Sequence, residues 1–342
     1  MLPVERIESY CRLNVGHGNE VKIVGKAPLL WAVMVFLTGL SAGASGDSVA
    51  PYPELYIAVA DGNSADLRPS DDAPVVAMLA ERSAALSKNQ GLVLVVVTHG
   101  WFERYNWTRE MALAMERRAG GSTVICGCFE WRALARRVNP VDAARAATQT
   151  AGPLLGDKIL KLSLEWDHVH LIGHSAGAWV ISEASEAVAR YTKASIHLTF
   201  LDAYVPPFWD ESRLGKVAED PNVAYWADHY FTRDLTLGAT EKPLTHAHNV
   251  DLTRVDPGIK DHRLPHYWYH GTIIGQYDEN QRYAGKTLWY RANGIRYGFD
   301  RSQEAGMRNR RRNQKLQMGA EAIEITPDRP PAWLEKLVNL FR

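Results

Sequence analysis

Short apolar runs alternate along this chain with longer segments in which apolar residues recur at helical spacing. The run LVLVVVT at residues 92–98 is apolar at every position before its final threonine. A strand that is apolar on both faces is typical of the centre of a parallel sheet covered by helices on each side. Runs of this kind predict strands at residues 54–60, 92–98, 123–129, 169–173, 196–201, 223–231 and 248–253.

The segments between these runs predict helices. They span residues 107–120, 139–163 and 178–193. In the last of them, apolar residues such as Val180, Ile181, Ala184 and Val188 recur at the helical period. Strands that alternate with helices form βαβ units, so the pattern predicts an α/β fold with a mostly parallel central sheet and helices on both faces.

The N-terminal segment has the pattern of a targeting sequence. Residues 27–40 are apolar and uncharged, follow Lys22 and Lys26, and precede the small residues Ala-Gly-Ala at 42–44. The run is shorter than the ~20 residues that cross a membrane. We therefore interpret residues 1–44 as a secretory leader, which implies a secreted or periplasmic protein, or a membrane-anchored one if the leader is not cleaved.

Composition divides the rest of the chain into two parts. With 342 residues, 46% of them hydrophobic, the chain can bury a large core. We expect a catalytic domain at residues 50–275. Residues 276–342 form a C-terminal extension that is basic at 308–315 and partly helical at its end. The formal net charge of zero argues against a nucleic-acid partner, and we expect membrane contact only through the N-terminal segment. The sequence does not assign an oligomeric state.

Cysteine and histidine pairs do not predict a metal site. Cys126 and Cys128 alternate within one predicted strand and so share a face, where two buried thiols are expected. His246 and His248 form another pair, but nothing in the sequence joins the two pairs into a four-ligand site. We expect neither a metal nor an organic cofactor.

The segment Gly173-His174-Ser175-Ala176-Gly177 fits the pattern G-x-S-x-G between a predicted strand and a predicted helix. A nucleophilic serine must project from a sharp turn, and glycine on each side removes the Cβ atoms that would clash there. The N-terminus of the following helix favours negative charge that develops at the serine. This pattern makes Ser175 the candidate nucleophile.

A serine nucleophile needs a base and an acid that follow it in the chain. His262 comes after the last predicted strand and the turn-rich stretch DPGIKD, where a catalytic base belongs. Asp202 stands at the end of a predicted parallel strand, which is where such sheets keep their reactive groups. We favour Asp202 as the acid, and Asp228 stays open as the alternative.

The oxyanion of an acyl-transfer intermediate needs backbone N–H donors. Ala176, directly after the nucleophile, supplies one. The stretch His99-Gly100 breaks an early strand and leaves the N–H of Trp101 available as the second donor.

These segments resemble the α/β-hydrolases, and within them the pancreatic-type lipases, over residues 90–275. The resemblance implies an α/β-hydrolase fold, export, ester substrates, a Ser175–Asp202–His262 triad, and oxyanion donors at Trp101 and Ala176. The acid segment departs from the family, because Leu201 and Ala203 replace its glycine and proline. The disulfides of animal secreted lipases are missing, which favours a bacterial-type esterase or lipase. The segments that carry the resemblance are THGWFERYNW, VICGCFEW, VHLIGHSAGA, LTFLDA and HRLPHYWY.

The sequence thus predicts a secreted serine hydrolase that cleaves a small-molecule or lipid carboxylic ester through an acyl-enzyme. Two alternatives stay open: an acyltransferase that uses the same triad, and a non-catalytic binding protein on a hydrolase scaffold. Tyr204, Phe208 and Trp209 are candidates for lining an acyl pocket, with core packing as the equal alternative.

Overall fold

The computed structural model describes the main part of the chain between residues 52 and 324. The expected leader at residues 1–44 and the basic run at 308–315 lie outside the described residues. The described ranges are 52–61, 64–87, 91–119, 121, 123–216, 225–233, 242–253, 262–274, 291–292, 295–299 and 322–324.

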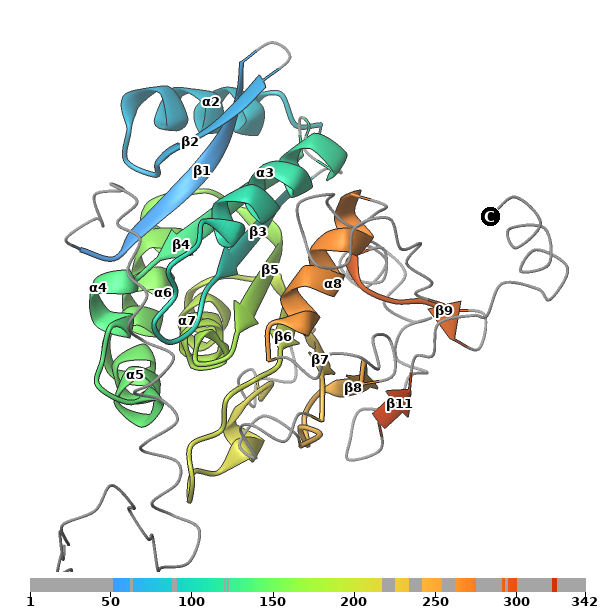
Figure 1. The fold of residues 1–342 in the computed structure, drawn as a ribbon. Coiled ribbons are helices and arrows are strands. Elements are labelled where there is room, and N and C mark those ends of the chain that lie inside the picture. Colours follow the sequence, from blue (N-terminus) through green and yellow to red (C-terminus); the bar gives the residue numbers. More distant parts are fainter. Residues whose placement is uncertain are drawn as a thin grey trace, which may run out of the picture. The chain divides into compact units, whose positions relative to one another are not determined.

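A nine-stranded sheet forms the centre of the molecule, in the order β11-β8-β7-β6-β5-β3-β4-β1-β2 (Figure 1). Every pairing from β11 to β4 is parallel, whereas β1 and β2 join antiparallel at one edge. The strands are β1 (Glu54–Asp61), β2 (Ser64–Pro69), β3 (Leu92–Thr98), β4 (Val124–Glu130), β5 (Trp166–His174), β6 (Ser195–Leu201), β7 (Tyr225–Phe231), β8 (His248–Asp251) and β11 (Ala322–Glu324).

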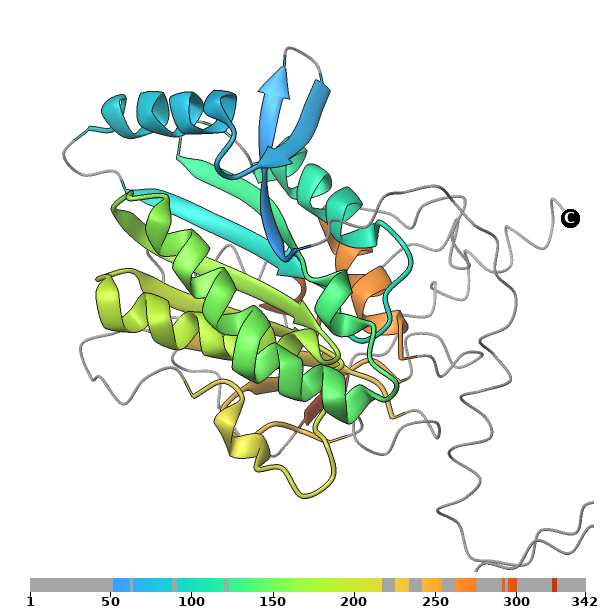
Figure 2. The ribbon, with the colours of Figure 1, turned by 90° about the vertical axis from the view of Figure 1, so that its left-hand side faces the viewer.

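Helices cover both faces of the sheet, as Figure 2 shows from a second direction. The side chains of β3 alternate between them: Leu94 and Val96 belong to one apolar cluster, and Val95 and Val97 to the other. The first cluster is completed by α2 (Ala73–Ala84), α5 (Pro140–Ala146), the π-helical turn η1 (Ala147–Ala151), α6 (Gly152–Lys161) and α7 (Gly177–Tyr191). The second is completed by α3 (Trp107–Ala119) and α8 (Leu264–Ile274).

The predicted α/β class with a parallel sheet and two helical layers is confirmed. All seven predicted strands are present, from β1 to β8 without β2. The helix predicted at 107–120 is α3, and the one at 178–193 is α7. The segment predicted as one helix at 139–163 contains α5, η1 and α6 in direct succession.

The sheet and its core extend beyond the predicted domain boundary at residue 275. β11 pairs in parallel with β8, and Tyr297 and Phe299 are fully buried in the same cluster as α8. These residues of the expected C-terminal extension therefore belong to the central sheet and its core. A small hairpin of β9 (Arg291–Ala292) and β10 (Ile295–Arg296) precedes them.

The two cysteines of β4 are free, buried and on the same face of the sheet, as predicted. Burial raises the pKa of both thiols, so neither is a reactive thiolate at neutral pH. None of the helices in the described residues is both long and apolar enough to cross a membrane.

Candidate active site

The carboxyl ends of three neighbouring parallel strands bring the predicted functional segments together. β3 ends at Thr98 and leads into His99-Gly100, β5 ends at His174 before Ser175, and β6 ends at Leu201 before Asp202. Because β5 lies between β3 and β6 in the sheet, Ser175 stands between the oxyanion segment and the acid segment.

Ser175 lies on a strained turn between β5 and α7. Its φ is +55°, in the left-handed region that non-glycine residues rarely adopt. A Cβ on Gly173 would lie 2.6 Å from the carbonyl oxygen of Gly177, and a Cβ on Gly177 would lie 2.5 Å from that of His99. Both positions of the motif therefore require glycine, because the backbones on either side of Ser175 approach too closely for a side chain.

The acid segment is joined to this turn by backbone hydrogen bonds. The Ser175 N–H donates to the Leu201 carbonyl over 3.0 Å, and the Tyr204 N–H donates to the Ser175 carbonyl over 3.2 Å. Asp202 lies between these two contacts with a φ of +52°. The turn after β6 thus adopts the same unusual backbone region as the turn after β5, and the two are fastened side by side.

Asp202 contacts His262 directly. The Asp202 side chain is fully buried, and its Oδ2 lies 2.7 Å from Nδ1 of His262. Its other oxygen, Oδ1, accepts the N–H of Thr232 over 3.1 Å, which fixes the carboxylate plane. A carboxylate accepts, so Nδ1 of His262 carries the hydrogen and the lone pair of the neutral ring lies on Nε2. This is the tautomer that a general base for a serine hydroxyl needs.

Asp228, the alternative acid, is occupied elsewhere. Its Oδ1 accepts the hydroxyl of Thr199 over 2.6 Å and lies 3.2 Å from Nε2 of His197, and its Oδ2 accepts the hydroxyl of Tyr230 over 3.2 Å. This network is buried on the face of the sheet that α8 covers. The structure therefore brings Asp202, and not Asp228, to His262.

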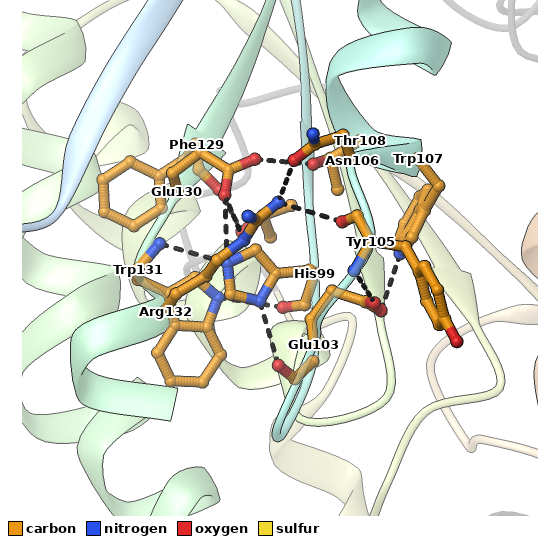
Figure 3. A network of polar contacts seen from close by, with 12 residues as sticks. His99, Glu103, Tyr105, Asn106, Trp107, Thr108, Phe129, Glu130, Trp131 and Arg132 are labelled. Atoms are coloured by element: carbon orange, nitrogen blue, oxygen red, sulfur yellow. Dashed lines mark hydrogen bonds and ion pairs between the residues drawn. The ribbon is translucent and has the colours of Figure 1, made fainter. Parts of the chain in front are cut away.

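The oxyanion segment lies against the nucleophile turn. A Cβ on Gly100 would lie 2.6 Å from Cβ of Ser175 and 3.2 Å from its Oγ. Nδ1 of the fully buried His99 lies 2.9 Å from the Gly100 carbonyl, and its Nε2 accepts the Trp131 N–H over 3.2 Å (Figure 3). Burial lowers the pKa of His99, so the ring is neutral and donates from Nδ1.

The contact between His99 and the Gly100 carbonyl sets the direction of the Trp101 amide. The peptide bond between Gly100 and Trp101 is trans, so its N–H and its carbonyl point in opposite directions. With the carbonyl held by His99, the Trp101 N–H points away from that buried ring. The Trp101 side chain is held as well, since its Nε1 donates to the Arg137 carbonyl over 2.9 Å.

A polar network supports the segment that follows, as Figure 3 shows. Glu130, at the end of β4, pairs with Arg132 over 2.9 Å and accepts the hydroxyl of Thr108 over 2.7 Å. Arg132 in turn donates to the Tyr105 carbonyl over 2.9 Å. Glu103 accepts from Nε1 of Trp107 over 2.8 Å. The oxyanion segment is therefore braced along its length by residues after β4 and by the start of α3.

Large apolar side chains are exposed on the loops that carry the site. Phe208, after the acid segment, is fully exposed and has a φ of +68°. Phe102, Tyr105 and Val138 are also exposed, on the oxyanion segment and the turn that its Trp101 contacts. Apolar side chains are therefore exposed both on the oxyanion segment and on the loop after the acid segment.

The three predicted acyl-pocket residues have different surroundings. Tyr204 is buried, and its carbonyl accepts from Nε1 of Trp179 over 2.8 Å. Trp209 packs edge-on against Trp179 with 4.7 Å between ring centroids. Phe208 is exposed. Tyr204 therefore belongs to the core, whereas Phe208 faces solvent, and a shared pocket lining remains a prediction. Within the described residues, no three histidine, cysteine or acidic side chains are arranged to hold a metal ion.

Comparison with known proteins identifies the family. The model of the family described as Lipase matches residues 70–246, just over half of the chain. The chain belongs to the lipase family. The match includes the nucleophile turn, the acid turn and the oxyanion segment.

Individual relatives of this lipase-family chain are distant. Hepatic triacylglycerol lipase of Bos taurus is 32% identical over 173 residues, and that of Homo sapiens is 30% identical over 166 residues; each match covers 46% of this chain and 33% of the relative. The chain thus spans about a third of the length of these curated relatives.

Among solved structures, a lipase/esterase from Lactobacillus plantarum is 11% identical with a TM-score of 0.28, covering 54% of this chain and 79% of that one. An esterase from Pyrobaculum calidifontis is 12% identical with a TM-score of 0.27, covering 43% of this chain and 59% of that one.

Sequence reasoning missed the residues that brace the lipase-family site. His174 was only a spacer within the G-x-S-x-G pattern, and His99 was expected to break the strand ahead of the oxyanion loop, but its contacts to Gly100 and Trp131 were not foreseen. Glu130 and Arg132 carried no pattern at all. The one available signal was the position of each residue at the end of a parallel strand or within two residues after it, where side chains reach the carboxyl end of the sheet.

Proposed function

We propose that the protein is a serine hydrolase that cleaves carboxylic esters, with Ser175 as nucleophile, His262 as base and Asp202 as acid. The observation that carries the proposal is the 2.7 Å contact between Asp202 and His262, at the sheet edge where Ser175 occupies its strained turn. Membership of the lipase family supports the reaction class.

In the proposed reaction, Nε2 of His262 takes the hydroxyl proton as Oγ of Ser175 forms a bond to the carbonyl carbon of the ester. The electron pair of the carbonyl moves onto oxygen, and the N–H groups of Trp101 and Ala176 stabilise that charge. The carbon–oxygen bond to the alcohol then breaks, and the alcohol leaves with the proton from His262. A water molecule repeats the sequence on the acyl-enzyme and releases the acid.

Asp202 contributes by charge and orientation. It receives no proton, but its buried carboxylate stabilises the imidazolium that forms on His262 and keeps Nδ1 as the donor. Ala176 is fully buried directly before α7, so its amide belongs to the first unsatisfied N–H groups of a helix. The helix N-terminus adds a partial positive charge at the same position.

The exposed apolar residues around the site favour an ester with an apolar acyl group. Phe208 combines full exposure, which contributes no packing, with a left-handed backbone, which costs stability. Because the related proteins of Bos taurus and Homo sapiens are named triacylglycerol lipases, acylglycerols belong among the first substrates to test. We further propose export of the chain, on the basis of the apolar run at residues 27–40; detection of the protein in the medium or periplasm would test this.

The decisive experiment combines labelling and hydrolysis. The wild-type chain and its Ser175→Ala variant would be treated with a fluorophosphonate probe and then assayed on p-nitrophenyl esters of increasing acyl length. We expect labelling at Ser175, hydrolysis by the wild type, and loss of both in the variant. Absence of labelling and turnover in a folded wild-type chain would favour a binding protein. A product ester formed with an added alcohol, in preference to the free acid, would favour an acyltransferase.

A further inference from the structure

We propose that His174, the residue directly before the nucleophile, is a positioning residue that holds the general base through the backbone of His262. The inference rests on the proposed function, because it assigns a role for His174 in the same reaction. It concerns a different atom from the Asp202 contact: Asp202 orients the imidazole ring of His262, whereas His174 contacts the backbone of that residue.

The contact is direct. His174 is the last residue of β5 and is 5% exposed, and its Nε2 lies 3.1 Å from the carbonyl oxygen of His262. A carbonyl oxygen can only accept, so Nε2 of His174 carries the hydrogen. The donor comes from the rigid centre of the sheet and the acceptor from the turn before α8, two segments that are 88 residues apart in the sequence.

Aromatic rings fix the His174 side chain from three sides. Its ring centroid lies 4.7 Å from that of His262, 4.8 Å from that of His266, and 5.8 Å from that of Trp107, which it meets edge-on. Trp107 and His266 stack on each other at 4.3 Å. The His174 ring therefore has little freedom to rotate away from the His262 carbonyl.

This arrangement suits the requirement of the reaction. The proton transfer needs Nε2 of His262 within hydrogen-bond reach of the serine hydroxyl. The Asp202 contact sets the ring direction but allows the backbone of His262 to pivot about it. The His174 contact removes that pivot. Because His174 and Ser175 are chain neighbours, the contact also fixes the position of the base relative to the nucleophile.

Two variants with the same functional group separate this role from general packing. In His174→Gln, the side-chain amide N–H reaches the place of Nε2, whereas in His174→Asn the same amide is one methylene too short. His168→Asn is the matched control, since His168 lies on the same strand and the same sheet face but contacts Ser195 instead of the site. All chains would be assayed for kcat, KM, the rate of fluorophosphonate labelling and thermal unfolding.

We expect His174→Asn to lower kcat and the labelling rate together, by about 10- to 100-fold, because a misplaced base costs rate in the chemical step. KM should change little. His174→Gln should recover most of this loss, and His168→Asn should keep the wild-type rates. A second readout is the low-field proton resonance of Nδ1–H in His262, which should broaden or shift in His174→Asn and return in His174→Gln.

The outcomes distinguish the two proposals. Wild-type rates in His174→Asn, or equal losses in the Gln and Asn variants with an unchanged His262 resonance, would overturn the positioning role while leaving the ester hydrolase intact. If both variants lower stability, the His262 resonance measured on the folded fraction still shows whether His174 positions the base or only contributes packing. A wild-type chain that fluorophosphonate does not label at Ser175 would instead overturn the proposed function, and the positioning role with it.

Discussion

The N–H of Ser175 donates to the carbonyl of Leu201 over 3.0 Å, so the turns after β5 and β6 are bonded to each other at the site. Leu201 is followed at once by Asp202, and both Ser175 and Asp202 have left-handed backbones. A nucleophile turn and an acid turn that share backbone hydrogen bonds cannot shift independently. The geometry between the proposed nucleophile Ser175 and the proposed acid Asp202 is thereby built into the sheet, and only the proposed base, His262, comes from a more distant segment.

The two candidate acids should respond differently to the same substitution. Asp202→Asn keeps the shape of the side chain but favours the wrong tautomer of His262, so we expect kcat to fall by about 10⁴-fold with little change in KM. Asp228→Asn should leave kcat within a few-fold and lower stability by about 1–3 kcal/mol, because the buried contacts to Thr199 and Tyr230 are disturbed. Steady-state kinetics and urea unfolding of both variants would test this. A large loss of kcat in Asp228→Asn alone would reverse the assignment.

Substitution of His99 should affect the transition state more than substrate binding. His99→Leu removes the donor that holds the Gly100 carbonyl and lets the Trp101 amide rotate, so we expect kcat to fall by about 10²- to 10³-fold. His99→Asn keeps an N–H close to the position of Nδ1 and should lose less. The affinity for a boronic acid, which mimics the tetrahedral intermediate, should fall in parallel with kcat/KM. Unaltered boronic acid affinity in the Leu variant would contradict the role.

The sequence was sufficient to predict seven of the described strands and the order of the site segments, because both depend on local patterns. An apolar run such as residues 92–98 can only be buried on both faces, and the glycines around Ser175 leave few alternatives to a tight turn. Asp202 and His262 were proposed as acid and base from their places after strands, and the structure places them in contact. The choice between Asp202 and Asp228 needed the register of β6 and β7, which no local pattern contains.

Elements such as α8 and β11 escaped prediction for physical reasons. α8 carries a weak amphipathic pattern, because it is buried against α3 and the sheet and is apolar almost all round. β11 has only three residues, far from the rest of the sheet in the sequence. Its pairing with β8 is a tertiary contact with no periodicity to indicate it. The bracing of the oxyanion segment by Glu130 and Arg132 is likewise a long-range contact.

Added methyl groups should separate the glycines that the site needs from one that it does not. Gly177→Ala places a Cβ 2.5 Å from the carbonyl of His99, so we expect loss of most activity and a lower melting temperature. In Gly121→Ala the new Cβ meets nothing within 4 Å, and activity and melting temperature should stay close to those of the wild type. Activity assays and calorimetry on both variants measure this. Full activity in Gly177→Ala would mean that the turn tolerates displacement.

Stability should decline as the pH falls from neutral toward 4. Burial lowers the pKa of His229 to about 4, whereas its unfolded value is about 6.5. Between these values the unfolded chain binds more protons, so the free energy of unfolding decreases as the pH decreases, by roughly 3 kcal/mol for this residue. Burial also lowers the pKa of His170 and His266, and they act in the same direction. Urea unfolding at pH 7, 5.5 and 4.5 should show the decline, and His229→Gln should reduce its slope; an equal slope in that variant would exclude His229 as a contributor.

Replacement of Phe208 should separate stability from action on apolar substrates. Phe208 has a φ of +68° and a fully exposed ring, so Phe208→Gly removes backbone strain and loses no packing. We expect the variant to be as stable as the wild type or more stable by about 1 kcal/mol. It should hydrolyse a short, water-soluble p-nitrophenyl ester at the wild-type rate, because the ring lies outside the reacting groups. On an emulsified long-chain ester, hydrolysis by Phe208→Gly should fall several-fold, because the variant lacks an exposed ring that contacts the acyl chain or the emulsion surface. Val138→Ser changes another exposed apolar residue, next to the Arg137 whose carbonyl Trp101 contacts, and tests whether the effect belongs to more than Phe208 alone. Equal rates on the emulsified ester in both variants and the wild type would show that these side chains do not contact the substrate phase.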